Sequence, residues 1–148
     1  MTALRVNALA PDGINELAAA LTAAGLPIAD LNNLDRVFFR FDDHALAGFG
    51  GIEGGGADRL LRSIVVAPGR RNTGLGRAIL GLLESQARAL GVVRLHLLTT
   101  TAAPFFAANG YDAADRATAP ASIAVSAEFA SLCPASAAYL VKSLEARP

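Results

Sequence analysis

The sequence has almost no cysteine and no excess of charge of either sign. Its single cysteine, Cys133, stands alone among 148 residues. One thiol cannot form an internal disulfide and does not make a zinc-type cluster, so we expect no bound metal and a reducing, cytoplasmic setting. Lys plus Arg and Asp plus Glu number 13 each, which gives a net charge of zero. The charge balance therefore predicts no attraction to nucleic acid or to a membrane surface.

Long apolar runs are also missing. Hydrophobic residues make up 53% of the chain, yet they are interrupted everywhere by polar residues and glycine. No stretch approaches the roughly 18 apolar residues of a membrane span, and the first residues lack the apolar run of a signal peptide. We expect one domain over residues 1–148, long enough to bury a core of its own.

The most informative segment is residues 61–77. It reads as a buried strand over residues 60–67, a basic loop with glycines, and a helix that begins at Leu75. Such a loop places backbone N–H groups and the positive end of a helix dipole beside Arg70, Arg71 and Arg77, a combination that binds pyrophosphate. The alternative is an ordinary strand-to-helix turn that uses glycine for its geometry.

Hydrophobic periodicity predicts the remaining elements. In the first half we expect a strand over 3–8, a helix that Asp12 caps and Gly25 ends, a hairpin of strands 37–41 and 45–53, and a bend at Gly54–Gly56. In the second half we expect a helix over 75–90, a strand over 92–99 parallel to 60–67, a helix over 102–109, a strand from Tyr111 and a closing strand over 137–144. Residues 120–132 fit a strand or a helix, and their spacing slightly favours a helix.

Two phrases in this arrangement resemble one protein family. The first is Val66-Ala67-Pro68 followed by Arg71-Asn72-Thr73-Gly74-Leu75-Gly76, and the second is Phe105-Phe106-Ala107-Ala108-Asn109-Gly110-Tyr111. With the order of elements over residues 3–144, they resemble the GNAT acyl-CoA N-acetyltransferases. The resemblance implies a single α/β domain whose mixed, twisted sheet has helices on both faces. It also implies that acetyl-CoA is the co-substrate and that a small primary amine attacks it directly.

A narrower resemblance concerns two shorter segments, residues 61–66 and 128–137. They resemble the acetyltransferases encoded in arsenic-resistance operons, which are related to the phosphinothricin and arsinothricin N-acetyltransferases. This implies an amino-acid-like acceptor with a second acidic group, for which an organoarsenical is one option. A homodimer is left open.

The family also assigns the cofactor. The pyrophosphate of coenzyme A would bind the turn formed by Arg70, Arg71, Asn72, Thr73, Gly74, Leu75, Gly76 and Arg77. The pantetheine arm and the acetyl group would lie against a splayed strand end at Ile64, Val65 and Val66, near Thr99, Phe105 and Phe106. Two residues depart from the family: Phe106 stands where a tyrosine often protonates the leaving thiolate, and Thr99 stands where asparagine is common. The replacement acid would be water or one of Ser63, Thr99, Thr100, Thr101, Tyr111 and Tyr139.

Three residues are candidates for catalysis and acceptor binding: Glu53, Arg62 and Ser63. Glu53 ends the strand beside the central one and could take the proton of the acceptor's ammonium; Leu60 occupies the place where the family often has a glutamate. The alternative interpretation of Glu53 is a solvated acid in a loop. Arg62 lies in a central strand, where a charge is costly unless paired. The resemblance implies that Arg62 and Ser63 hold the acceptor's acidic group, whereas the alternative is a structural salt bridge to Asp58 or Glu53.

Two other classes of function fit the sequence. One is an acyl-CoA-binding sensor with little catalysis, which the loss of tyrosine at Phe106 allows; release of free thiol in the presence of amines would argue against it. The other is an arsenic-binding or interaction module built around Cys133, whose metalloid binding would not need acetyl-CoA.

Overall fold

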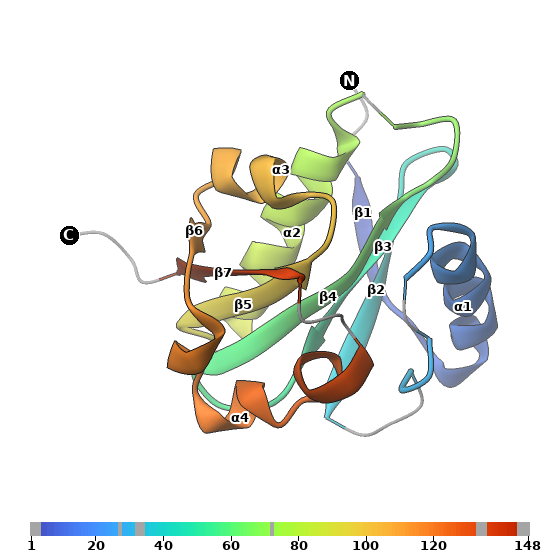
Figure 1. The fold of residues 1–148 in the computed structure, drawn as a ribbon. Helices are drawn as coiled ribbons and strands as arrows, with labels where there is room; N and C mark the ends of the chain where they lie inside the picture. The colour runs from blue at the N-terminus through green and yellow to red at the C-terminus, as the bar shows by residue number, and fades with distance from the viewer. Residues whose placement is uncertain (1–3, 27, 32–34, 72, 133–135, 145–148) are drawn as a thin grey trace.

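The computed structural model describes residues 4–26, 28–31, 35–71, 73–132 and 136–144. These residues form a seven-stranded mixed sheet in the order β1-β2-β3-β4-β5-β7-β6 (Figure 1). The strands are β1 (Arg5–Ala8), β2 (Arg36–Asp42), β3 (Leu46–Glu53), β4 (Asp58–Val66), β5 (Arg94–Thr99), β6 (Asp112–Ala113) and β7 (Ala138–Ser143). Neighbouring strands are antiparallel except β4 and β5, which are parallel. The expected mixed sheet and its strand–helix–strand crossover are confirmed.

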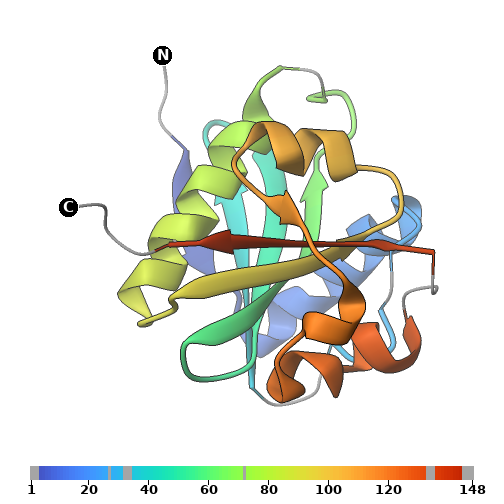
Figure 2. The ribbon, with the colours of Figure 1, turned by 60° about the vertical axis from the view of Figure 1, so that its left-hand side comes forward.

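Helices cover both faces of the sheet. On one face, Leu17 and Leu21 of α1 (Ile14–Ala23) pack with Phe38, Phe49 and Val65. On the other face lie α2 (Leu75–Ala89) and α3 (Ala103–Ala108), whose apolar residues share a core with the strands. Figure 2 shows α1 and α2 on opposite sides of β2, β3 and β4. None of the helices in the described ranges has the length and apolar character needed to cross a membrane.

Glycines in β3 allow α2 to approach the sheet closely. A Cβ atom on Gly48 would clash with the backbone oxygen of Val65 and lie 2.8 Å from Cδ1 of Ile79. A Cβ atom on Gly50 would clash with Cδ1 of Leu83. Since Ile79 and Leu83 belong to α2, these two glycines set the distance between that helix and the sheet.

The strand β4 divides into two halves with different neighbours. Its parallel pairing with β5 joins only Asp58–Leu60 to Arg94–His96, and beyond these residues the two strands diverge (Figure 2). In the same region Ser63 has a φ of 59°. The pairing with β3 steps from Gly51↔Arg62 to Phe49↔Val65, so Ser63 and Ile64 together face Gly50 in a β-bulge. The expected splay of β4 is confirmed, and the bulge is a feature that no pattern in the sequence indicated.

Two details of the sequence prediction need correction. Asp12 does not cap the first helix, because it lies inside a short 3₁₀ turn, Pro11–Gly13, and Gly13 takes the N-cap position. Residues 120–132 are not one helix but two short pieces, α4 (Ala121–Ala124) and a single π-helical turn, Glu128–Leu132. The preference for helix over strand in this segment was right, and the π-helical turn carries Glu128, whose Oε2 lies 3.4 Å from Nε of Arg62 in β4.

Candidate active site

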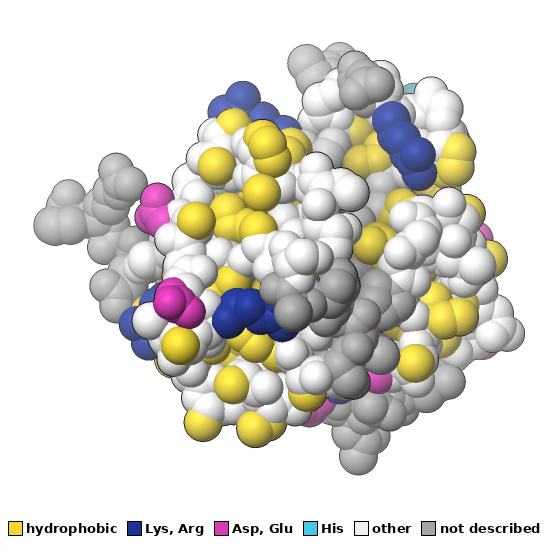
Figure 3. All heavy atoms as spheres, in the orientation of Figure 1, with side chains coloured by type: hydrophobic (Ala, Val, Ile, Leu, Met, Phe, Trp, Pro, Cys, Tyr) yellow, Lys and Arg dark blue, Asp and Glu magenta, His cyan; other side chains and the backbone are white. Residues whose placement is uncertain are grey.

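A cavity of about 740 Å³ opens where β4 and β5 diverge. Residues 61–66 of β4 and 97–99 of β5 form its walls, and the end of α1, the beginning of α3 and Glu128 close its sides. In the space-filling view the face over α1 and α3 carries mainly hydrophobic and uncharged side chains, with separate Lys or Arg side chains at its upper rim (Figure 3). Such a lining suits a ligand with a long, weakly polar arm.

Most of the expected cofactor residues lie together around this cavity. The lining includes Ile64, Val65, Val66, Arg71, Gly76, Thr99, Phe105 and Phe106. Phe106 is 7% exposed, and its ring meets those of Phe105 and Tyr111 edge to face. Both phrases of the sequence contribute residues to this cavity, whereas Arg70, Thr73, Gly74 and Leu75 line a separate cavity of about 860 Å³.

The glycine-bearing turn leads directly into α2. Gly74 has a φ of 82° and takes the N-cap position, a conformation that glycine adopts without strain. The first helical bond runs from the N–H of Ala78 to the oxygen of Gly74. The N–H groups of Leu75, Gly76 and Arg77 therefore precede the hydrogen-bonded part of the helix, as an anion site at a helix N-terminus requires.

The three arginines of the turn point in different directions. Arg71 reaches the cavity, while Arg77 is exposed to solvent. Arg70 is held by the β2–β3 turn, because its two terminal nitrogens donate to the carboxylate of Asp43 at 2.8 and 2.6 Å. The same pair holds the pKa of Asp43 below its usual range. Thr73 donates its hydroxyl to the backbone oxygen of Arg70, Leu75 is half-buried, and Asn72 lies outside the described residues.

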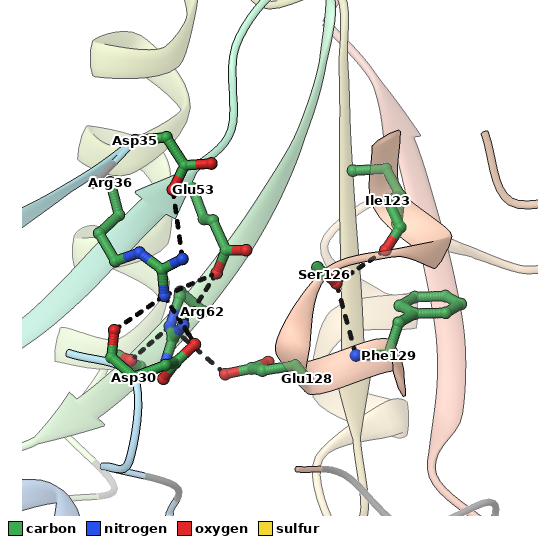
Figure 4. Close-up of polar contacts among 10 residues, drawn as sticks. Asp30, Asp35, Arg36, Glu53, Arg62, Ile123, Ser126, Glu128 and Phe129 are labelled. Carbon is green, nitrogen blue, oxygen red and sulfur yellow. Dashed lines mark hydrogen bonds and ion pairs between the residues drawn. The ribbon is translucent and has the colours of Figure 1, made fainter. Parts of the chain in front are cut away.

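Arg62 sits at the centre of a buried group of charges (Figure 4). Its Nη1 and Nη2 donate to Asp30 at 2.5 and 2.7 Å, and Nη1 also donates to Oε1 of Glu53 at 2.8 Å. Its Nε donates to Oγ of Ser63 at 3.1 Å and lies 3.4 Å from Oε2 of Glu128. The side chain of Arg62 has no exposed surface.

A second guanidinium completes the group. Nη1 of Arg36 lies 2.6 Å from Oδ2 of Asp30 and 3.3 Å from Oε1 of Glu53. We call Asp30, Arg36, Glu53, Arg62 and Glu128 the Arg62 cluster; it contains three carboxyl groups and two guanidinium groups. Burial alone would raise the pKa of Asp30, but its hydrogen bonds to the two arginines lower it. Burial alone would lower the pKa of Arg62, but the hydrogen bond to Asp30 and the neighbouring carboxylates raise it.

These contacts bear on the roles expected for Arg62, Ser63 and Glu53. All three nitrogens of Arg62 already donate hydrogen bonds within the protein, so an anion of the acceptor would have to displace one of these partners. Of the two salt-bridge partners expected, Glu53 pairs with Arg62, whereas Asp58 pairs with Arg94 and His96. Glu53 is 5% exposed and lines a separate cavity of about 310 Å³, so it is not a solvated loop acid.

Glu128 is the site residue that the sequence reading missed. It is 5% exposed, and it is the one carboxylate among the described residues that line the cavity between β4 and β5. Burial raises the pKa of Glu128 to about 7, with the charges of Asp30 and Glu53 adding to the rise and those of Arg62 and Arg36 opposing it. The only signal in the sequence was an acid within a mostly apolar segment, between Ala127 and Phe129.

The candidate proton donors separate into two groups. Ser63, Thr99 and Thr101 line the cavity, and Phe106 beside them has no hydroxyl. Tyr111 instead donates to Glu84 on α2, and the hydroxyl of Tyr139 lies 2.7 Å from Nδ1 of the buried His96. Neither tyrosine lines the cavity, so a hydroxyl of the first group or water is the nearer source of a proton.

Comparison with known families gives one match. A model described as an acetyltransferase (GNAT) domain matches residues 33–113. This span contains the glycine-bearing turn and both strands that line the cavity. It also contains Arg36, Glu53 and Arg62 of the Arg62 cluster, whereas Asp30 and Glu128 lie outside it. No curated protein matches the sequence.

Several solved structures share the fold. The first is N-acetylglutamate synthase from Neisseria gonorrhoeae in complex with coenzyme A and L-arginine, with a TM-score of 0.78 and 18% identity over 99% of this chain and 34% of that chain. The present chain thus spans about a third of the synthase. A GNAT-family acetyltransferase from Staphylococcus aureus Mu50 has a TM-score of 0.76 and 16% identity over 97% and 100% of the two chains. A Mycobacterium tuberculosis protein solved with CoA has a TM-score of 0.75 and 18% identity over 95% and 99%.

The raised pKa of Glu128 predicts how stability depends on pH. Between about 4.5, the ordinary value in the unfolded chain, and about 7, the folded protein binds more protons than the unfolded chain. The contribution of Glu128 is therefore present below this window and is lost as the pH rises through it. At about 1.4 kcal/mol per pKa unit, the loss is about 3 kcal/mol.

Urea unfolding of the parent and of Glu128→Gln, measured from pH 4.5 to pH 8, tests this. The free energy of unfolding of the parent should fall relative to that of the variant across the window. Asp30, Asp43 and Asp58 have lowered pKa values, so their contributions change only below it. Parallel curves for parent and variant would mean that Glu128 titrates normally.

Proposed function

The chain belongs to the acetyltransferase (GNAT) family, and on this premise we propose that it transfers an acetyl group from acetyl-CoA to the primary amine of a small acceptor. The observation that carries the proposal is the cavity between the diverging halves of β4 and β5, beside the N-terminus of α2. A thioester and an amine can meet there without competing for one binding site.

The placement of the co-substrate follows from the backbone. Beyond Leu60, β4 leaves its pairing with β5, so its peptide groups are available to the pantetheine arm along Ile64, Val65 and Val66. The pyrophosphate then falls at the turn before α2, close to Arg71 and the first N–H groups of the helix. Two of the structures of similar fold contain coenzyme A, which supports acetyl-CoA as the co-substrate.

The reaction is a direct attack of the neutral amine on the thioester carbon. No covalent acyl-enzyme is required, because holding both substrates in one cavity supplies much of the rate. The thiolate that leaves cannot take a proton from Phe106. Water, or a hydroxyl of Ser63, Thr99 or Thr101 on the cavity wall, serves instead.

The acceptor class rests on the narrower resemblance of residues 61–66 and 128–137. It favours an amino-acid-like amine with an organoarsenical or phosphinothricin-like side group. If the acceptor carries such an acidic group, that group has to displace one of the carboxylates that hold Arg62, because Arg71 is taken by the pyrophosphate. Cys133, the residue of the arsenic-binding alternative, lies outside the described residues.

The proposal is tested by incubating the protein with acetyl-CoA and a panel of primary amines, including amino-acid analogues with arsenic or phosphorus side groups. We expect free thiol to appear only with an accepted amine, together with an equal amount of the N-acetyl product by mass spectrometry. If acetyl-CoA binds but no amine in the panel increases thiol release, the sensor alternative is the better account.

The phosphate-binding turn is tested at Gly74, where a matched pair of variants isolates charge. Both Gly74→Asp and Gly74→Asn introduce a side chain at a positive φ, so they share the same strain, and they differ only in charge. Because the new carboxylate repels the pyrophosphate, calorimetry should give a Kd for CoA at least about tenfold weaker for the aspartate variant than for the asparagine variant. Equal affinities in two folded variants would place the pyrophosphate elsewhere.

A further inference from the structure

We infer that the Arg62 cluster is a receptor for the acceptor's ammonium group, in which Glu128 binds the ammonium and then takes its proton. The inference deepens the proposed function and rests on it. It assigns the role of general base to a residue from the segment before β7 rather than to Glu53.

The first argument is the charge balance of the cluster. Three carboxyl groups face two guanidinium groups, and every member is largely buried. With all five ionised, these five groups carry a net charge of −1, which is costly away from water. A proton on Glu128 removes this charge in the empty protein. A cation in the adjoining cavity removes it equally well, and the ammonium of a primary amine is such a cation.

The second argument is which carboxylate the acceptor can reach. Asp30 and Glu53 are held by hydrogen bonds of 2.5 to 2.8 Å to Arg62, and Glu53 lines the smaller cavity. Glu128 approaches Arg62 from the opposite side, at 3.4 Å, as Figure 4 shows. It lines the cavity between β4 and β5 together with Ser63, Ile64 and Val65. Glu128 is thus the carboxylate of the cluster that faces the place proposed for the thioester.

The third argument is the match of proton affinities. An alkylammonium has a pKa of about 10, far above that of an ordinary glutamate. Burial, with Asp30 and Glu53 adding and Arg62 and Arg36 opposing, raises the pKa of Glu128 to about 7. A base is most effective when its pKa lies near the working pH. Glu128 is therefore a stronger base than an ordinary glutamate, and the difference between its pKa and that of the ammonium falls from about 6 to about 3.

The proton and electron balance is complete without a further reactant. The ammonium gives one proton to Glu128, and the nitrogen lone pair forms a bond to the acetyl carbon. The carbon–sulfur bond breaks with its electron pair on sulfur, and a second proton leaves the nitrogen and neutralises the thiolate. Glu128 then releases its proton to solvent before the next turnover.

The experiment compares two acceptors in the full-length parent and in Glu128→Gln. One acceptor is an alkylamine that is charged at pH 7, and the other is a fluorinated alkylamine of similar size that is already neutral. For the charged amine, kcat/KM at pH 7 should fall by about a hundredfold or more in the variant. For the neutral amine the fall should be only a few-fold, and the loss with the charged amine should shrink as the pH rises.

Glu53→Gln is the matched control, because it changes a carboxylate of the same cluster that does not line the cavity between β4 and β5. It should affect both amines alike. The melting temperature and the Kd for acetyl-CoA show whether each variant is folded. If Glu128→Gln does not fold, Glu128→Asp keeps the charge and should slow only the charged amine.

An equal loss with both amines in a folded Glu128 variant would overturn the inference and leave the proposed function intact. If the parent acetylates neither amine, the panel of primary amines decides the proposed function separately, and calorimetry then measures binding at the ammonium site. The charged amine should bind the parent and lose at least about tenfold in affinity in Glu128→Gln. Unchanged affinity would overturn the inference on that readout too.

Discussion

The buried guanidinium of Arg62 is the interaction on which the arrangement of this site depends. From β4 it reaches Asp30 in the segment after α1, Glu53 at the end of β3 and Glu128 in the π-helical turn before β7. The Cζ atom of Arg62 also lies over the ring of Phe38 in β2, 5.7 Å from the ring centroid. Removing one partner of a buried pair costs about 3–5 kcal/mol, so these segments are held to one centre. This contact and the edge-to-face contact of Phe129 with Tyr139 in β7 hold the π-helical turn that carries Glu128 against the sheet.

The strand that carries Arg62 also opens the cavity in which we propose that the reaction takes place. Up to Leu60 it pairs with β5 and belongs to an ordinary parallel sheet. Directly after Arg62 the bulge at Ser63 and Ile64 turns the strand away, and the cavity begins. The glycines of β3 let α2 pack close on the same region, which brings the helix N-terminus to the rim. One strand therefore fixes the charges at the base of the cavity and supplies the peptide groups along its wall.

Local patterns in the sequence were enough to predict most of the elements and the glycine-bearing turn between β4 and α2. The helix predicted from the apolar stripe that begins at Leu75 lies within a few residues of its predicted bounds. The same holds for the two strands of the hairpin before Gly54. Contacts between distant segments could not be predicted, because no residue near Arg62 in the sequence indicates that Asp30 and Glu128 are its partners. The same limit explains Arg70, whose salt bridge to Asp43 depends on how the β2–β3 turn folds back. Asp12 failed as a cap because a 3₁₀ turn preceded the helix.

The most direct test of the central claim is a titration of the Glu128 carboxyl by carbon-13 NMR, with the resonance identified by its absence in Glu128→Gln. The account predicts a midpoint near pH 7 in the free protein, and a lower midpoint when an alkylammonium acceptor is bound, because the cation favours the ionised carboxylate. A midpoint close to 4.5, unchanged by the acceptor, would contradict it.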